Sequence, residues 1–119
     1  MKKSITLICT CLLVACTSSG MGTIEDIKTS LTPAVYKTNK SASELFYCVA
    51  EKIEIHGFTV NSRISPDNKS GQLYTHIDYL GRQVTSIFSL KAGRLEVRAA
   101  KAVWYGWKSE VFKIAKDCV

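Results

Sequence analysis

Four side chains in the second half of the chain are of the types used in acid–base catalysis: Tyr74, His76, Asp78 and Arg98. The first three alternate along one stretch, so in a β-strand they project from the same face. A histidine beside a carboxylate, with a tyrosine and an arginine close by, can transfer protons. An open sheet face, however, has no cleft to exclude water or to hold a substrate. This pattern therefore favours a binding surface over an active site.

Tyrosine and arginine supply much of the binding energy at protein interfaces, which makes the same region suited to a protein contact. The strand pairing expected below sets Ile87 beside His76, with Arg98 beyond it and Tyr74 next along. Two further arginines lie near the edges of this patch. We predict an interaction face that comprises Tyr74, His76, Ile87, Arg98, Arg63 and Arg94. A plain solvated face remains the alternative.

Metal and thiol chemistry find less support in the sequence. Beyond the N-terminal segment, the possible soft ligands are Cys48, His56, His76 and Cys118, and none has the close paired spacing of a structural zinc site. The chain also has no Gly-rich phosphate loop and no Gly-x-Ser-x-Gly motif. We therefore expect no metal, no cofactor and no enzymatic activity.

The first sixteen residues have the features of an export signal. A basic start, Met1-Lys2-Lys3-Ser4, precedes an apolar run of about ten residues that is too short to span a bilayer as a helix. This run leads into Leu13-Val14-Ala15-Cys16, and the segment resembles a bacterial lipoprotein signal peptide that ends in a lipobox. The resemblance implies cleavage after residue 15 and acylation of Cys16. Thr17, in place of an aspartate, implies the periplasmic face of the outer membrane; the inner membrane and the cell surface remain alternatives. No family is recognised for the rest of the chain.

The compartment decides how the five cysteines are used. Cys9 and Cys11 would leave with the signal peptide and Cys16 would carry lipid, so Cys48 and Cys118 remain. In an oxidising envelope such a pair predicts a disulfide, whereas in the cytosol it would indicate two buried thiols. Closing a loop of about 70 residues stabilises a domain by roughly 4 kcal/mol in the chain-entropy account.

The net charge narrows the range of partners. Sixteen Lys and Arg against ten Asp and Glu give +6, and loss of the two lysines in the signal peptide leaves +4. This mild positive charge does not indicate a nucleic-acid binder. It would favour anionic headgroups or serve solubility alone. The expected partners are the lipid bilayer, through Cys16, and a protein of the envelope; the oligomeric state is not indicated.

The remaining 104 residues fit one domain on a tether. Residues 16–40 are rich in Ser, Thr, Gly and Lys and are predicted to be flexible, with Pro33 as a breaker. The domain, residues 41–119, opens with a capping box at Ser41 and a helix that stops at Gly57. A second helix follows Gly106. The apolar arc of the first helix comprises Ala42, Leu45, Phe46, Cys48, Val49, Ile53 and Ile55, and that of the second comprises Trp107, Val111, Ile114, Ala115 and Cys118.

Four strands are expected between the two helices. Their turns are placed at 66–71, at Gly81-Arg82 and at Ala92-Gly93, with the last corner a possible bulged loop because Ala92 suits a primed turn poorly. Pairing across these turns gathers the large apolar side chains on one face, opposite a polar face that includes Thr85. The sequence thus predicts an α+β fold, a four-stranded antiparallel meander with both helices packed on one face in the order α-β-β-β-β-α.

These features predict a non-enzymatic binding module of the cell envelope, anchored by lipid. A lipoprotein that confers immunity or exclusion by blocking a toxin, a phage component or a lytic enzyme is the alternative. A small hydrolase that uses His76 is a third hypothesis. Loss of a partner, of protection or of turnover on substitution of His76 and Arg98 would distinguish the three.

Overall fold

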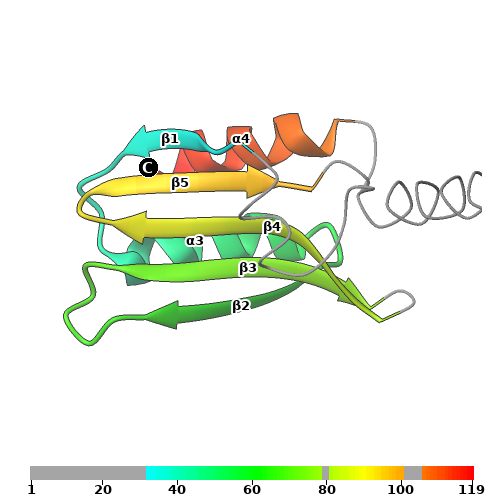
Figure 1. Cartoon of the computed structure of the whole chain (residues 1–119), viewed down its shortest axis with the longest axis horizontal. Coiled ribbons are helices and arrows are strands. Elements are labelled where there is room, and N and C mark those ends of the chain that lie inside the picture. Colours follow the sequence, from blue (N-terminus) through cyan, green and yellow to red (C-terminus); the bar gives the residue numbers. More distant parts are fainter. Residues whose placement is uncertain (1–31, 79–80, 101–105) are drawn as a thin grey trace, which may run out of the picture.

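The computed structural model describes residues 32–78, 81–100 and 106–119. Five antiparallel strands form one sheet in the order β1-β5-β4-β3-β2, and two helices lie behind it (Figure 1). The elements are β1 (Ala34–Lys37), α3 (Ala42–Glu54), β2 (Thr59–Ile64), β3 (Gly71–Asp78), β4 (Arg82–Lys91), β5 (Arg94–Ala99) and α4 (Trp107–Cys118). The α+β class and the two helices on one face are confirmed, but the prediction of four strands is wrong.

The additional strand is β1, and it lies within the stretch 16–40 that was predicted to be a tether. It pairs with β5, so that Tyr36 stands opposite Leu95 and Ala34 opposite Val97. The Tyr36 hydroxyl donates a hydrogen bond to the backbone carbonyl of Phe112 in α4, at 3.4 Å. Four residues directly after a proline are too few to display a period of two, which is why the pattern did not predict this strand.

Helix α3 begins as its capping box predicts. The Ser41 hydroxyl accepts a hydrogen bond from the Glu44 backbone N–H at 3.3 Å and lies 3.1 Å from the Glu44 carboxylate. The helix ends at Glu54, and Gly57 follows with a φ of +85°. Ile55 was expected on the buried arc, but it is the C-cap residue and its side chain is 81% exposed. Helical spacing no longer predicts burial once the helix has ended.

Helix α4 buries the stripe that its sequence predicts: Trp107, Val111, Ile114, Ala115 and Cys118. Trp107 lies in the core, where its ring packs edge-on against Phe58 with centroids 4.8 Å apart. Its indole N–H donates to the Thr85 carbonyl at 2.9 Å, so the one polar atom of this large ring is satisfied. This contact joins the start of α4 to the sheet.

The β4–β5 hairpin has the predicted register, with Leu90 opposite Leu95 and Phe88 opposite Val97. Its loop contains only Ala92 and Gly93, whose φ angles are +52° and +72°. Positive φ at both central residues is the geometry of a type I′ turn, which matches the twist of the flanking strands. The corner is therefore the two-residue turn that the spacing predicts, and not the bulged loop that Ala92 left as the alternative.

The pairing of β3 with β4 contains a β-bulge that the prediction did not include. Thr85 and Ser86 both lie opposite Thr75, and both hydroxyls are 2.6 Å from the Thr75 hydroxyl in a buried cluster. Thr85 was expected on the polar face, but the bulge turns its side chain toward Thr75. On the turn side of the bulge Asp78 pairs with Arg82, so three residues connect the strands in place of the two predicted at Gly81-Arg82. His76 therefore stands opposite Val84, where Ile87 was expected.

Elsewhere in β2 and β3 the register is shifted by two residues from the prediction. Leu73 stands opposite Ser62 and Phe88, in place of Ile64 and Leu90. A shift by an even number leaves every side chain on its predicted face, since side chains alternate with a period of two. The inner face of the sheet therefore still carries Leu73, Phe88, Leu90, Leu95 and Val97 against the helices.

Candidate functional site

The predicted interaction face lies on the side of the sheet away from α3 and α4, which is turned toward the viewer in Figure 1. We call this side the outer face. Antiparallel pairing aligns its side chains in rows that cross the sheet. The rows are Thr59–His76–Val84, Asn61–Tyr74–Ile87–Arg98, Arg63–Gln72–Ser89–Glu96–Val35 and Lys91–Arg94–Lys37.

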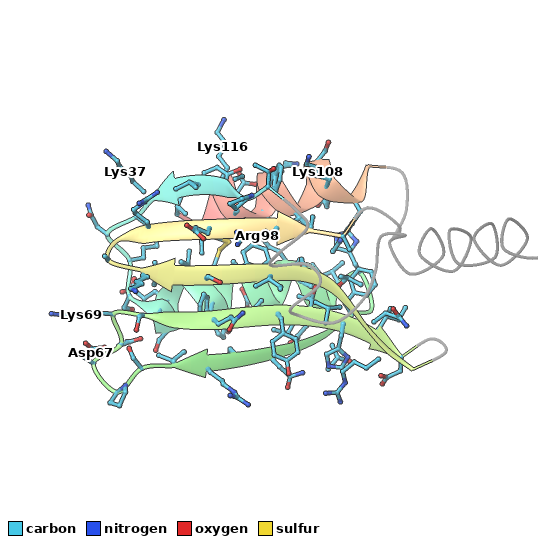
Figure 2. All side chains as sticks on the ribbon, viewed as in Figure 1. Lys37, Asp67, Lys69, Arg98, Lys108 and Lys116 are labelled. Atoms are coloured by element: carbon cyan, nitrogen blue, oxygen red, sulfur yellow. A yellow bond between two sulfur atoms is a disulfide. The ribbon has the colours of Figure 1, made fainter. Side chains whose placement is uncertain are left out.

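Three residues of the predicted face share one row. Tyr74 is opposite Ile87, and Ile87 is opposite Arg98. Ile87 is only 1% exposed, whereas Tyr74 and Arg98 are half-buried. The Arg98 guanidinium lies 3.5 Å from the Glu96 carboxylate, and Figure 2 shows Arg98 over the middle of the sheet. A partner would thus reach the tyrosine and the arginine, but not the isoleucine between them.

His76 is buried, with 3% of its side chain exposed. Its Nε2 lies 2.8 Å from the side-chain nitrogen of Asn61, and because an amide nitrogen can only donate, Nε2 is the acceptor of that hydrogen bond. Nδ1 is 4.0 Å from the Asp78 carboxylate, which is too far for a hydrogen bond, and it has no hydrogen-bond partner among the described residues. The ring of Tyr74 is tilted against it, with centroids 6.1 Å apart.

The structure therefore brings together three of the four residues of the suggested acid–base site. Tyr74, His76 and Asp78 are neighbours on β3, whereas Arg98 lies two strands away on β5. The imidazole is enclosed and the Asp78 side chain is 75% exposed, so a substrate at the carboxylate would not reach the ring. This geometry suits a histidine that fixes Asn61 and Tyr74 on the outer face.

The remaining two arginines of the predicted face lie apart from the Tyr74 row. Arg63 is exposed on the edge strand β2, opposite the neutral Gln72. Arg94 is exposed at the start of β5, between Lys91 of β4 and Lys37 of β1. Lys37 was not recognised from the sequence because β1 was not predicted. Lys91 and Arg94, by contrast, flank the Ala92-Gly93 turn and could have been paired from the sequence alone.

Two hollows lie near that turn. One, of about 350 Å³, is lined by Ser89, Lys91, Ala92, Arg94 and Glu96 on the outer face. The other, of about 680 Å³, lies among residues 38–41, 67–69 and 92–93, with Glu44 at its wall. Neither is lined by His76. The hollows and the histidine therefore belong to different parts of the molecule.

The turn between β2 and β3 is held by a carboxylate. Asp67 accepts hydrogen bonds from the Ser65 hydroxyl and from the Lys69 backbone N–H, the latter at 3.1 Å. These two bonds favour the charged form and lower the pKa of Asp67 below its ordinary value of 3.8, the hydroxyl contributing more. The turn is thus ordered by its own side chains, at the same end of the molecule as Lys37 (Figure 2).

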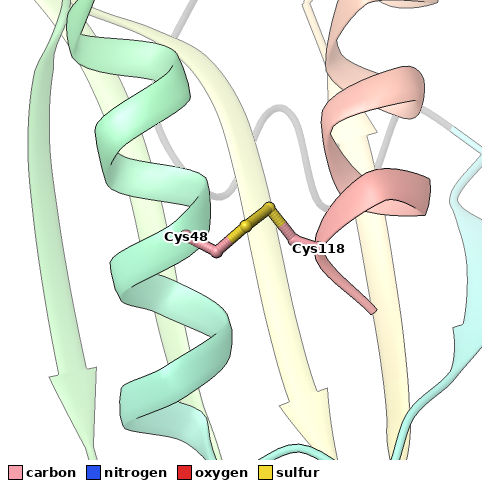
Figure 3. The surroundings of a disulfide bond; sticks show 2 residues. All are labelled: Cys48 and Cys118. Carbon is pink, nitrogen blue, oxygen red and sulfur yellow. A yellow bond between two sulfur atoms is a disulfide. The ribbon is translucent and has the colours of Figure 1, made fainter.

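The predicted disulfide is present. Cys48 of α3 and Cys118 of α4 are bonded, with their Cα atoms 5.8 Å apart, and the bond joins the two helices across their line of contact (Figure 3). It links residues 70 apart in the sequence. Cys48 lies at the edge of the buried arc and Cys118 within it, as the helical patterns predict.

Some predictions concern residues that the structure does not describe, and others concern metal binding and membrane spans. Cys16 and the preceding segment lie outside the described residues, and so do Trp104 and Tyr105. Within the described ranges, His, Cys, Asp and Glu do not gather in any group of three that could hold a metal ion. In the same part of the chain, neither helix has the length and apolar character needed to cross a membrane.

The chain was also compared with known protein families, with curated proteins and with solved structures. None of the three comparisons found a match.

Proposed function

We propose that this chain is a lipoprotein of the cell envelope, anchored through acylated Cys16 on the periplasmic face of the outer membrane, whose domain binds another envelope protein and performs no catalysis. The observation that carries the proposal is the unequal covering of the sheet. Both described helices and the disulfide lie on the inner side, and the outer face presents aromatic and charged side chains.

The disulfide supports an exported location. Bonds of this kind form and persist in oxidising compartments and are rare in the cytosol. An exported chain is also what the basic start, the apolar run and the Leu13-Val14-Ala15-Cys16 sequence imply. Two independent features, one at the N-terminus and one in the folded domain, thus agree on the compartment.

The accessible part of the outer face supports binding. Tyr74 and Arg98 are half-buried, which lets part of each side chain meet a partner while the rest is held by the sheet. Arg63 is exposed in the neighbouring row of the sheet, and the ring of His76 lies against Tyr74 with centroids 6.1 Å apart. Anchoring raises the effective concentration of the domain at the membrane, so a weak contact through few residues suffices.

The anchor is tested by metabolic labelling with radioactive palmitate. We expect the wild-type chain to incorporate label and to fractionate with the outer membrane, and Cys16→Ser to do neither. Cys48→Ala, which keeps Cys16, is the matched control and should still be labelled. Absence of label on the wild-type chain would reject the anchor.

The contact is tested by crosslinking in intact cells followed by mass spectrometry. Replacement of an accessible tyrosine and arginine on the outer face, Tyr74→Ala with Arg63→Ala, should abolish the crosslinked product. The control pair is Tyr47→Ala with Lys52→Ala, because Tyr47 is 69% exposed on the solvent side of α3 and Lys52 is exposed on the same helix. Equal crosslinking by both pairs would contradict a contact through the outer face.

A further inference from the structure

We propose that the row Lys91–Arg94–Lys37 binds the phosphate headgroups of an anionic lipid surface, and we call it the basic row. Its three members are exposed on three adjacent strands, β4, β5 and β1, at the end of the sheet that holds the β4–β5 turn. Figure 2 shows Lys37 directed away from the sheet at this end.

The like charges of the basic row destabilise the folded domain. Arg94 is directly opposite a lysine on each side, and like charges in directly opposed positions destabilise a sheet. No acidic side chain among the described residues forms an ion pair with any of the three. The nearest one along β5, Glu96, is 3.5 Å from Arg98 instead. An anion from outside the chain would relieve the repulsion that the protein itself leaves uncompensated.

The spacing of the basic row fits several phosphates at once. Adjacent strands lie about 4.8 Å apart, so three cations in register occupy roughly 10 Å across the sheet. The hollow of about 350 Å³ beside them is lined by the Ser89 hydroxyl, Lys91 and Arg94, and also by Glu96, whose carboxylate is directed to Arg98 at 3.5 Å. A guanidinium can hold two phosphate oxygens in parallel and a hydroxyl can donate to a third, while the lysines act as point charges.

The composition of this end favours a lipid surface over an acidic protein. Protein hot spots are built around packed aromatic anchors, and the basic row contains none. Attraction to an anionic bilayer instead grows with each lysine or arginine near the surface. The second hollow at the same end is lined by Lys40 and Lys69 together with Glu44 and Asp67, so it adds no net charge. The small residues Ala92 and Gly93 let the turn approach a flat surface closely.

This inference goes beyond the proposed protein contact and does not depend on acylation. It is tested with the full chain carrying Cys16→Ser, by flotation with vesicles of phosphatidylcholine alone or with one third phosphatidylglycerol. The N-terminal segment, with Lys2 and Lys3 before the apolar residues 5–14, is the same in every variant, so a difference in binding between variants reports the residues that were changed. A failed palmitate experiment would leave this measurement unaffected.

The decisive variant is Lys37→Gln/Lys91→Gln/Arg94→Gln. Each cation near an anionic surface contributes about 1 kcal/mol, so the triple change should weaken binding to the anionic vesicles roughly a hundredfold. The matched control, Lys52→Gln/Lys108→Gln/Lys113→Gln, removes the same charge from exposed positions on α3 and α4 and should weaken binding less than tenfold. Near-ultraviolet circular dichroism checks that both variants are folded.

Three outcomes would overturn the proposal. The first is no preference of the chain for anionic vesicles, and the second is an equal loss in both triple variants, which would indicate net charge alone. The third is that the chain binds polyglutamate and not the vesicles, and that the basic-row variant no longer binds polyglutamate. This result would make the occupant an acidic protein. Displacement of the chain by about 300 mM NaCl but not by a few millimolar inorganic phosphate would support a surface of many headgroups over a single-phosphate site.

Discussion

The inner and outer faces of the sheet are ordered by different forces. On the inner face, Leu73, Phe88, Leu95 and Val97 are fully buried against two helices that the Cys48–Cys118 bond joins. On the outer face, side chains meet in rows, and one row, Lys91–Arg94–Lys37, brings like charges together. A shift of two residues along a strand leaves the same side chains buried, because the same face stays inside. The same shift changes which charged side chains lie opposite each other. The alternation of apolar residues is thus enough to define the inner face, whereas the contacts between side chains on the outer face depend on the strand register.

The largest expected effect tests what holds the helices on the inner face. Removing the disulfide in Cys48→Ala/Cys118→Ala frees a loop of about 70 residues and should lower the free energy of unfolding by about 4 kcal/mol. Urea denaturation monitored by Trp fluorescence measures this. A reducing agent should destabilise the wild-type chain to a similar degree and leave the variant unchanged. A wild-type chain that is indifferent to reductant would show that the bond adds nothing to stability.

The substitution Thr75→Val tests the buried hydroxyl cluster at the β-bulge of β4. The substitution removes the hydroxyl that both Thr85 and Ser86 contact in the buried cluster, and each orphaned polar group carries a desolvation penalty. We expect a loss of about 2 kcal/mol in the free energy of unfolding.

The control for this cluster replaces all three hydroxyls, as Thr75→Val/Thr85→Val/Ser86→Ala. Because no buried partner is then left unsatisfied, the triple variant should be more stable than the single one. A single variant as stable as the wild-type chain would mean that the hydroxyl cluster does not hold the bulge.

On the outer face, Arg94→Gln should stabilise the domain. It removes two opposed like-charge contacts, with Lys91 and Lys37, each unfavourable by a few tenths of a kcal/mol, so the gain should be about 0.5 kcal/mol at low salt and smaller at high salt. Arg63→Gln is the matched control, because Arg63 faces the neutral Gln72 and should change stability little. A destabilised Arg94→Gln would contradict the repulsion on which the basic row rests.

The smallest expected effect concerns Asp67, in the turn between β2 and β3. Because its hydrogen bonds lower the pKa of Asp67 in the folded chain, the carboxylate stabilises the fold above its ordinary pKa of 3.8. This contribution is lost as the pH falls through the lowered folded-state value. Asp67→Asn should therefore melt at a slightly lower temperature than wild type at pH 7, and the difference should vanish below the folded-state pKa. A difference that persists there would assign the effect to the side-chain shape.

The sequence predicted much of the architecture through local rules. The capping box at Ser41, the stripe from Trp107 to Cys118 and the pairing of Phe88 with Val97 each follow from spacing that a helix or hairpin imposes on its own residues. The disulfide followed from the predicted compartment and from the placing of both cysteines on buried stripes. These predictions needed no knowledge of distant contacts, and the structure confirms them.

Predictions that depended on distant contacts failed. Strand β1 is stabilised by its pairing with β5, about sixty residues away, and nothing in its own four residues indicates this. The candidate site failed in the same way: the pairing of β3 with β4 is shifted along the strands, which sets His76 opposite Val84 and not Ile87, and two of the six predicted face residues, His76 and Ile87, are buried. The sequence identified the right face of the sheet but not which of its side chains remain accessible.

By itself, the sequence determined the inner face and the two helices, because alternation, helical period and caps act between near neighbours. It determined the disulfide by leaving Cys48 and Cys118 as the two cysteines beyond the N-terminal segment. Only the tertiary structure decided the fifth strand, the bulge and the meeting of Lys37 with Arg94. These features depend on which strands lie side by side and in which register, and strand order and register are set by the packing of the whole core.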